Sequence, residues 1–324
     1  MSIEIVKPAI VSSLVAAPRE GYRSWGIGSG GAMDTFAYEM ANALVGNEQA
    51  AVIELGYSSS EIYFHDHQLI SATGKGFTLF ANEKPFPMWR PVGVEAGSIL
   101  KLVKTRGGAW SYLAVHGGWK AEEWLGSFTT HLTAKAGGFR GRLLQKSDRI
   151  ELNTLLQFQK DKIFHWSISS QQVAEVYNPT YTLRCMPSAE TELLLPECAK
   201  DFCRMEMMVT PQSNRMGYRL QCDRPLLAQP FNMVSSPVDV GTIQLLPDGN
   251  LIVLMADCQT TGGYPRIASV IAADLPKLAQ VMPGEKISFN MVSLQEAEWE
   301  WIKYKKRLAE LKRSCHLQIK NFLS

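Results

Sequence analysis

The residues best equipped for chemistry follow a short apolar run in the second half of the chain. The run from Leu251 to Asp257 is bounded by turn residues, which predicts a buried strand that leads to a carboxylate. The polar residues after it are Gln259, Thr260, Thr261, Gly262, Gly263 and Tyr264. Side-chain donors and acceptors, with two glycine N–H groups that can point at one oxygen, indicate a site for a small polar or anionic ligand. A polar hairpin in which Gly262 and Gly263 only make the turn is the alternative.

Two further groups could take part. Arg215 and Arg219 would share a face if they lie on one strand, and two guanidinium groups there would suit a carboxylate or a phosphate. An ion pair with local acids is the other interpretation. His116 ends a predicted strand in the first half and is followed by Gly117 and Gly118, where the backbone can approach a ligand or a neighbouring strand.

A helix is predicted after the glycine-rich segment 21–33. Asp34 is an N-cap, Phe36, Met40 and Leu44 recur at the helical period, and Gly46 is a stop signal. The spacing of Gly26, Gly28 and Gly31 imitates a dinucleotide fingerprint, with Glu54 at the end of the next strand. The residues before Gly26 are too polar for the buried parallel strand of that motif, so we discount a nicotinamide or flavin site.

Closely spaced strands without helical crossovers predict antiparallel β architecture in both halves. The turn 247–249 predicts a hairpin that leads into the Asp257 strand. Gln and Lys accumulate over 157–162, which predicts domains at 1–158 and 159–292, with a terminal segment at 293–324. His65 and His67 would lie on one strand face, but no third ligand is evident and no metal site is expected.

The terminal segment predicts one amphipathic helix. Apolar residues recur at steps of three and four: Leu294, Ala297, Trp301, Tyr304, Leu308, Leu311 and Cys315. The lysines and arginines between them form a solvated face, an interpretation that we prefer to a nucleic-acid site. The stripe either docks on the rest of the protein or meets a partner helix.

Composition and charge exclude several classes. A net charge of +2 from 33 basic and 31 acidic residues provides no field for nucleic acid or an anionic membrane. No apolar run approaches the roughly 18 residues that a membrane helix needs. Glu4, Lys7 and Pro8 interrupt the N-terminus, so no signal peptide is expected. The six cysteines form no CxxC pair, which favours a cytoplasmic protein with reduced thiols.

With these blocks in view, the chain resembles the family of allophanate hydrolase subunit 2, also called the 5-oxoprolinase C-subunit family or a biotin-dependent carboxyltransferase domain. The resemblance runs from about Gly21 to Val292. Its most specific blocks are Ser29-Gly-Gly-Ala-Met-Asp34, Ala41-Asn-Ala-Leu-Val-Gly-Asn47, Tyr112-Leu-Ala-Val-His-Gly-Gly118, Leu125-Gly-Ser127, Ser213-Asn-Arg-Met-Gly-Tyr-Arg-Leu220, Gly241-Thr-Ile-Gln244, Met255-Ala-Asp257, Gln259-Thr-Thr-Gly-Gly-Tyr-Pro265, Leu278-Ala-Gln280 and Pro283-Gly284.

The resemblance implies a mainly β fold of two β-rich domains, the C-terminal one a cyclophilin-like β-barrel, plus the terminal helix. It implies one component of an ATP-dependent complex that opens the lactam of 5-oxoproline to give glutamate. This component would be inactive without two partners, one like allophanate hydrolase subunit 1 (the 5-oxoprolinase B component) and the other like the 5-oxoprolinase A component.

Two alternatives remain open within the same resemblance. One is the carboxyltransferase component of a urea carboxylase system, and the other is a non-catalytic module that binds and inhibits a kinase. The complex would use ATP, the substrate would be a small amide, and no cofactor is expected on this chain alone. The sequence contains no Met-Lys-Met biotinylation segment, so any biotin would be carried by a partner.

On the 5-oxoprolinase hypothesis Asp257 is the base or orients a donor, and His116 transfers a proton. Arg215 binds the substrate carboxylate, while the Gly262 and Gly263 amides, with Thr260 or Thr261, stabilise charge on a carbonyl oxygen. The remaining substrate-binding candidates are Asp34, Gln259 and Tyr264. The chain departs from the family pattern at Cys258, where arginine is usual, at Ser236, where glutamate is common, at Phe128, where arginine is frequent, and at Ala16 and Pro18, where Asp and Gly often precede Arg19.

Overall fold

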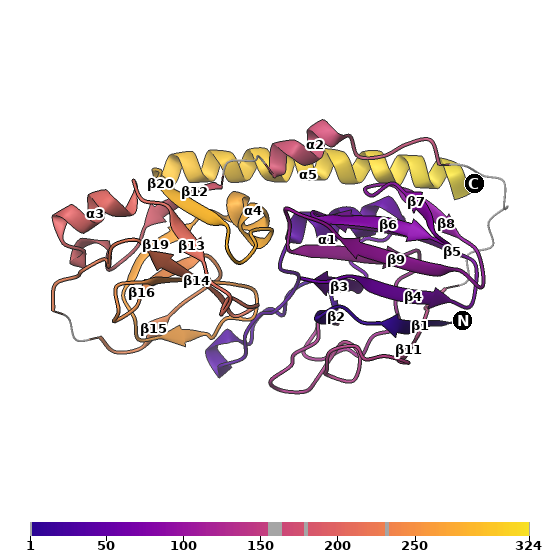
Figure 1. Ribbon diagram of the computed structural model, residues 1–324, viewed down its shortest axis with the longest axis horizontal. Coiled ribbons are helices and arrows are strands. Elements are labelled where there is room, and N and C mark those ends of the chain that lie inside the picture. Colours follow the sequence, from indigo (N-terminus) through magenta and orange to yellow (C-terminus); the bar gives the residue numbers. More distant parts are fainter. Residues whose placement is uncertain (1, 155–163, 178–180, 231–232, 324) are drawn as a thin grey trace. The chain divides into compact units, whose positions relative to one another are not determined.

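The computed structural model describes residues 2–154, 164–177, 181–230 and 233–323 (Figure 1). The chain divides into two compact units, and each is discontinuous in sequence. Unit 1 comprises residues 1–19, 34–173 and 307–324, and unit 2 comprises residues 20–33 and 174–306. The domain boundary expected at residue 158 lies in the stretch 155–163, outside the described residues.

Unit 1 is a sandwich of two sheets. In spatial order, the first sheet is β11 (Arg149–Glu151), β1 (Ser2–Lys7), β4 (Ser60–Phe64), β9 (Ile99–Lys104), β6 (Phe77–Ala81) and β7 (Lys84–Phe86). The second sheet is β2 (Val11–Val15), β3 (Val52–Gly56), β10 (Trp110–Val115), β5 (Gln68–Gly74) and β8 (Pro91–Val94). One apolar cluster includes side chains from both sheets, among them Ile5, Phe64, Ile70 and Leu102, so the core lies between the two sheets.

Every residue of β5 and β10 is buried, although alternation is the usual pattern of an antiparallel sheet. One face of these strands contributes to the sandwich core and the other lies under helix α1 (Thr35–Leu44). The hydroxyls of Ser71 and Thr73 donate to the helix carbonyls of Ala41 and Ala37 at 2.6 and 2.7 Å. The predicted helix is confirmed, because Asp34 caps it and accepts from the Ala37 N–H at 3.0 Å.

Unit 2 contains a closed barrel of seven strands. Around the barrel the order is β12 (Thr182–Pro187), β19 (Arg266–Val270), β16 (Thr242–Leu245), β17 (Leu251–Leu254), β14 (Gly217–Cys222), β13 (Met207–Val209) and β20 (Lys286–Met291). Only the β12–β20 pair is parallel among the described pairings of the barrel. The short strands β15 (Ser236–Pro237) and β18 (Thr261–Gly262) pair separately. The prediction of a mainly β chain with a barrel in its second half is confirmed, and so is the hairpin at 247–249.

The remaining helical elements of the described residues are η1 (Arg23–Trp25), α2 (Ser170–Val176), η2 (Thr191–Leu193), α3 (Pro196–Phe202), η3 (Ala272–Asp274), α4 (Leu275–Ala279) and α5 (Leu294–Leu323). Helix α5, yellow in Figure 1, is the predicted terminal helix. Leu308, Leu311 and Cys315 of its stripe are buried, whereas Leu294 and Trp301 are exposed. No helix in the described part of the chain combines the length and apolarity needed to cross a bilayer.

The two histidines with strand spacing do not lie on a strand. Residues 65–67 connect β4 to β5, so the prediction that both imidazoles share a strand face is wrong. Only residues 65–67 lie between β4 and β5, so they must form the turn and cannot extend either strand. His65 Nε2 lies 3.9 Å from the Glu4 carboxylate.

Candidate functional site

The carboxylate of Asp257 is held by Arg215 in unit 2. Strands β14 and β17 pair from Gly217 and Leu254, and backbone hydrogen bonds continue beyond the strand ends, with the Asp257 N–H donating to the Arg215 carbonyl at 2.8 Å. The guanidinium then reaches the carboxylate through Nε at 2.7 Å and Nη2 at 2.9 Å. Two donors on two oxygens make a bidentate pair, which fixes the plane of the carboxylate.

Arg215 is the buried member of this pair. It is 8% exposed as a residue, and its Nη2 also donates to the Gly31 carbonyl at 2.7 Å. The Asp257 side chain keeps 26% of its surface exposed. Of the two interpretations of Arg215, the ion pair with a local acid is confirmed. Asp257 is the member of this pair that a ligand can reach.

Arg215 and Arg219 do not share a strand face. Arg215 precedes β14, in the turn closed by Asn214 and Gly217, whereas Arg219 lies within β14. The predicted site with two guanidinium groups required both arginines to lie on one strand, and they do not.

The glycine-rich segment 20–33 belongs to unit 2 and contacts the Asp257 loop. The Arg23 guanidinium donates to the Val238 carbonyl and to Ser29 Oγ, and lies 3.5 Å from the Asp239 carboxylate. A Cβ on Gly28 would be 3.0 Å from the Cys258 carbonyl oxygen, so the backbones pass close together there. Arg23 was not predicted as a site residue, and the glycines beside it were the only sequence signal of a close backbone approach there.

Cys258 is buried behind this segment. Burial raises the pKa of its thiol to about 11, although the neighbouring Arg23 guanidinium acts in the opposite direction. The thiol is therefore protonated at neutral pH, which makes it a poor nucleophile. A guanidinium does lie beside position 258, where arginine is usual in the resembled family, but Arg23 supplies it.

The cysteines should differ sharply in reactivity. All six are free, and Cys203 is exposed while the other five are buried. We expect one thiol to react rapidly with Ellman's reagent in the native protein and five more to react only after denaturation. Loss of the rapid phase in Cys203→Ser is the check, and a rapid phase that persists in that variant would contradict the assignment.

The loop after Cys258 is tied down by its backbone. Ser236 pairs with Gly262 and Pro237 with Thr261, and the Val238 N–H donates to the Thr260 carbonyl at 3.0 Å. The exposed members of the loop are Gln259, Thr261, Gly263 and Tyr264. Their side chains are available to a ligand, and the backbone that carries them is ordered by pairing.

Gly262 is needed for a close approach and not for a special backbone angle. Neither Gly262 nor Gly263 is among the described residues with positive φ. A Cβ on Gly262 would be 2.6 Å from Nε2 of the buried Gln244, which donates to the Tyr264 carbonyl at 3.3 Å. The backbone angles of these two glycines are therefore ones that other residues can also adopt.

Gly262→Ala should destabilise the protein. Gln244 is 1% exposed, and its amide would have to move away from the Tyr264 carbonyl, so we expect a cost of about 1–3 kcal/mol in the free energy of unfolding. Gly263→Ala is the matched control, because its Cβ would meet only Ser235 Oγ at 3.5 Å, an ordinary contact. Urea denaturation of both variants measures the difference, and equal stabilities would contradict it.

His116 and Asp34 lie in unit 1, at opposite ends of α1. The Val45 carbonyl, just after the helix, lies 2.7 Å from His116 Nδ1, and a carbonyl only accepts, so Nδ1 carries the proton and Nε2 is left as an acceptor. Asp34 is fully buried as the N-cap. The structure thus brings Arg215 and Asp257 together near the 259–264 loop in unit 2, and does not bring His116 and Asp34 together.

A buried polar network beside Asp34 was not expected. Tyr112 Oη donates to Glu54 Oε2 at 2.8 Å and accepts from the Asp34 N–H at 2.7 Å, and all three residues are 0% exposed. Burial raises the pKa of Tyr112 well above its usual value, and the charges of Glu54 and Asp34 act in the same direction. The only sequence signal of this network was Glu54, an acidic residue on an apolar strand. We had connected Glu54 only with the dinucleotide motif, which we discounted.

Comparison with known proteins shows the family of the chain. The family model described as "Carboxyltransferase domain, subdomain A and B" matches residues 25–291, a span that includes the Arg215–Asp257 pair and the whole barrel. The chain belongs to this family. The predicted fold is therefore supported both by the family match and by the observed strand order.

Two relatives are of similar length. The chain is 38% identical over 281 residues to the C subunit of 5-oxoprolinase from Haemophilus influenzae, which covers 86% of this chain and 87% of the relative. It is 33% identical over 297 residues to the C subunit of 5-oxoprolinase from Escherichia coli, covering 91% and 93%. Urea amidolyase of Saccharomyces cerevisiae is 28% identical, but the match covers only 17% of that protein.

Solved structures agree on the fold. The urea carboxylase of Kluyveromyces lactis superposes with a TM-score of 0.85 at 24% identity, over 96% of this chain and 29% of the other. The urea amidolyase of K. lactis gives 0.84 at 24% identity, over 96% and 20%. At this identity the likeness concerns the fold alone.

Proposed function

We propose that the chain is one component of a hetero-oligomeric, ATP-dependent 5-oxoprolinase, which opens the lactam of 5-oxoproline to give glutamate. The observation that carries the proposal is 38% identity to the C subunit of a 5-oxoprolinase along almost the whole of both chains. Relatives in the urea amidolyase group are far longer than this chain and less similar to it. Partners like the B and A components of 5-oxoprolinase would complete the complex, and we do not assign the ATP site to this chain.

The chemistry needs charge stabilisation and proton transfer. Opening a lactam places negative charge on the carbonyl oxygen, and fixed donors stabilise it. We assign that role to the Gly263 amide with Thr260 or Thr261, whereas the Gly262 amide of the sequence-based hypothesis belongs to backbone that pairs with Ser236 and holds the loop in place. Asp257 would accept or orient a proton, and His116 would use its Nε2 acceptor for proton transfer.

Three further residues remain candidates for substrate contact. Gln259 and Tyr264 are exposed on the loop and can reach a ligand directly. Asp34 is buried as the cap of α1, which supports an indirect effect through the position of that helix.

The geometry favours a changed role for Arg215. Both carboxylate oxygens of Asp257 and the Gly31 carbonyl already accept from its guanidinium. We therefore assign Arg215 to positioning Asp257, in place of binding the substrate carboxylate. The exposed part of the pair is the carboxylate, which suits contact with the reacting amide.

Arg215→Lys separates these two roles. A lysine keeps the charge but loses the bidentate geometry. If Arg215 positions Asp257, kcat for 5-oxoproline should fall about tenfold or more with KM nearly unchanged. If Arg215 binds the substrate carboxylate, KM should rise instead, and that result would contradict the positioning role. Arg204→Lys, at an exposed position of unit 2, is the control.

Carboxyl transfer is the second candidate, because the family model is described as a carboxyltransferase domain and the urea amidolyases are relatives. Any biotin would be carried by another protein, and it would supply the carboxyl group. A non-catalytic, kinase-inhibiting module is the remaining alternative.

A substrate comparison tests the proposal. The full chain is reconstituted with its companion subunits and given ATP with either 5-oxoproline or urea, and ADP and glutamate are measured. We expect ADP and glutamate together from 5-oxoproline and no substrate-dependent ADP from urea. ATP turnover that depends on urea and on a biotinylated partner would favour carboxyl transfer. No turnover with either substrate would favour the binding module.

A further inference from the structure

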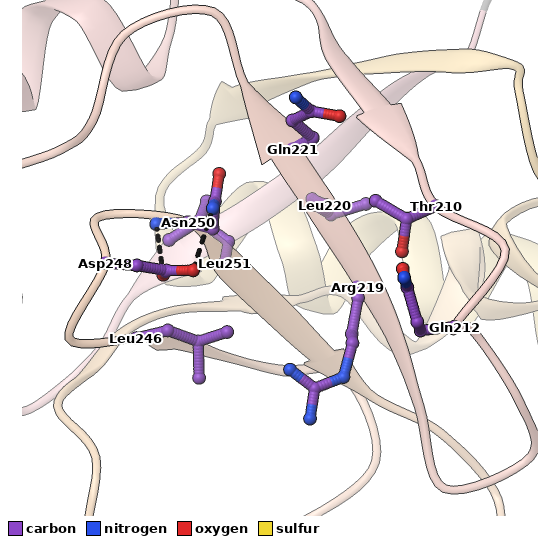
Figure 2. Close-up of a pocket in the computed structure, with 9 residues that line it drawn as sticks. All are labelled: Thr210, Gln212, Arg219, Leu220, Gln221, Leu246, Asp248, Asn250 and Leu251. Atoms are coloured by element: carbon purple, nitrogen blue, oxygen red, sulfur yellow. Dashed lines mark hydrogen bonds between the residues drawn. The ribbon is translucent and has the colours of Figure 1, made fainter.

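A hollow lies on the barrel of unit 2, away from Asp257. Its volume is about 400 Å³, and its polar lining comes from three segments of the barrel (Figure 2). These polar residues are Thr210, Gln212, Arg219, Gln221, Asp248 and Asn250. The hollow is at the Leu251 end of β17, next to the hairpin turn, whereas Asp257 follows the Leu254 end. It is therefore separate from the proposed active site.

The barrel directs these side chains outward. Leu220 and Cys222 of β14 point into the core, so Arg219 and Gln221 between them face out, in keeping with the alternating burial of the strand. The hairpin turn supplies Asp248 and Asn250. Asn250 is fixed, because its Oδ1 accepts from the Cys222 N–H at 3.0 Å. The lining thus stands on paired strands and a tight turn, which hold it in place.

The hollow carries one cation and one anion. Asp248 accepts from the Asn250 side chain at 2.9 Å and from the Asn250 N–H at 3.0 Å. These bonds, the side-chain bond foremost, lower the pKa of Asp248, and the Arg219 charge adds to the effect. Within the described residues the Arg219 guanidinium has no hydrogen-bond or ion-pair partner, so its donors are available to a ligand.

Uncharged donors surround this pair of charges. Thr210 Oγ1 is shielded from solvent and has no hydrogen-bond partner among the described residues. Gln212 and Gln221 are exposed, and the structure gives their side-chain amides no partner in the described part of the chain. Figure 2 shows Thr210 and Gln212 on one side of Arg219, with Asp248 and Asn250 on the other. A ligand in the hollow would meet donors on one side and a carboxylate on the other.

We propose that this hollow binds a small zwitterion, a free α-amino acid, whose carboxylate pairs with Arg219 and whose ammonium group pairs with Asp248. A simple anion would be repelled by Asp248 and a simple cation by Arg219, so the charge pattern favours a molecule that carries both groups. Thr210 and the glutamine amides would satisfy the remaining carboxylate lone pairs. This inference goes beyond the proposed function and does not depend on it, although glutamate, the product of the proposed reaction, is one member of the ligand class.

The test is calorimetric titration of the full chain alone with L-glutamate, L-glutamine and L-alanine. N-acetyl-L-glutamine lacks the ammonium group, and L-glutamine methyl ester lacks the carboxylate. We expect at least one of the three amino acids to bind with a Kd between about 0.1 and 10 mM, and the two derivatives of glutamine to bind at least about tenfold more weakly than glutamine. No binding of any of the three at about 10 mM, or equal binding of the derivatives, would overturn the proposal.

Variants locate the site. Arg219→Gln and Asp248→Asn should each weaken binding about tenfold or more, and Arg204→Gln, the same charge change at another exposed position of unit 2, should not. Thermal melts confirm that each variant is folded. Binding that survives both changes in the hollow would contradict the assignment. This binding test involves no partner protein, ATP or turnover, so its result is independent of 5-oxoprolinase activity. A chain without that activity can still bind the amino acid, and an active chain can fail to bind it.

Discussion

Asp257→Asn should lower turnover of 5-oxoproline by about a hundredfold or more in the reconstituted complex. The amide is nearly isosteric, so the hydrogen bonds from Arg215 at 2.7 and 2.9 Å can be partly retained. What the variant loses is the negative charge and the capacity to accept a proton. The expected loss is therefore in kcat, because the interaction that disappears is one made with the reacting group.

Steady-state measurement of glutamate release gives kcat and KM for this variant. Asp223→Asn is the matched control, since Asp223 is an exposed aspartate of the same unit, outside the 259–264 loop. Wild-type kcat in Asp257→Asn would remove Asp257 from the mechanism. Equal losses in both aspartate variants would show a general effect of charge removal.

Tyr112→Phe should give the largest loss of stability among single-atom changes in unit 1. The variant removes the donor to Glu54 Oε2 and the acceptor for the Asp34 N–H, both of which are fully buried. The loss of two buried hydrogen bonds costs about 2–4 kcal/mol in the free energy of unfolding. For a chain of this size that corresponds to a fall in Tm of roughly 3–6 °C.

Thermal denaturation by circular dichroism measures the shift. Tyr63→Phe is the control, because no hydrogen bond of the Tyr63 hydroxyl is found in the described part of the chain, and its change should stay within about 0.5 kcal/mol. If Tyr112→Phe proved as stable as Tyr63→Phe, the hydrogen bonds of Tyr112 with Glu54 and Asp34 would not stabilise the fold as we expect.

The raised pKa of Tyr112 has a consequence for pH dependence. Its neutral form is favoured in the folded state, so the stability from this shift is fully present below the usual tyrosine pKa near 10 and is lost as the pH rises toward the folded-state pKa. Alkaline unfolding of the wild type should therefore steepen above about pH 10, and Tyr112→Phe should show less of this dependence.

The sequence predicted the elements whose signals are local. Asp34 as an N-cap, the turn 247–249 and the terminal helix each depend on neighbouring residues, and all three are confirmed. The mainly β character was also predicted from the closely spaced strands, and the barrel was implied by the family resemblance.

Features that depend on contacts between distant residues were not predicted. The contact of Arg23 with Val238 joins residues 215 positions apart, and the glycines near Arg23 do not show which distant residue it contacts. Likewise Gly262 is required by the side chain of Gln244, and Tyr112 is placed by strand register beside Glu54. His65 and His67 had the spacing of a strand, but the shortness of the connection between β4 and β5 determined their conformation.

The most direct test of the account is an omission experiment. Glutamate release from 5-oxoproline and ATP is measured with the companion subunits alone and again after this chain is added, with Asp257→Asn added in a third reaction. We expect release only when the wild-type chain is present, and at most about a hundredth of that rate with the variant. Equal release in the presence and absence of this chain would contradict its assignment as a component that the reaction requires.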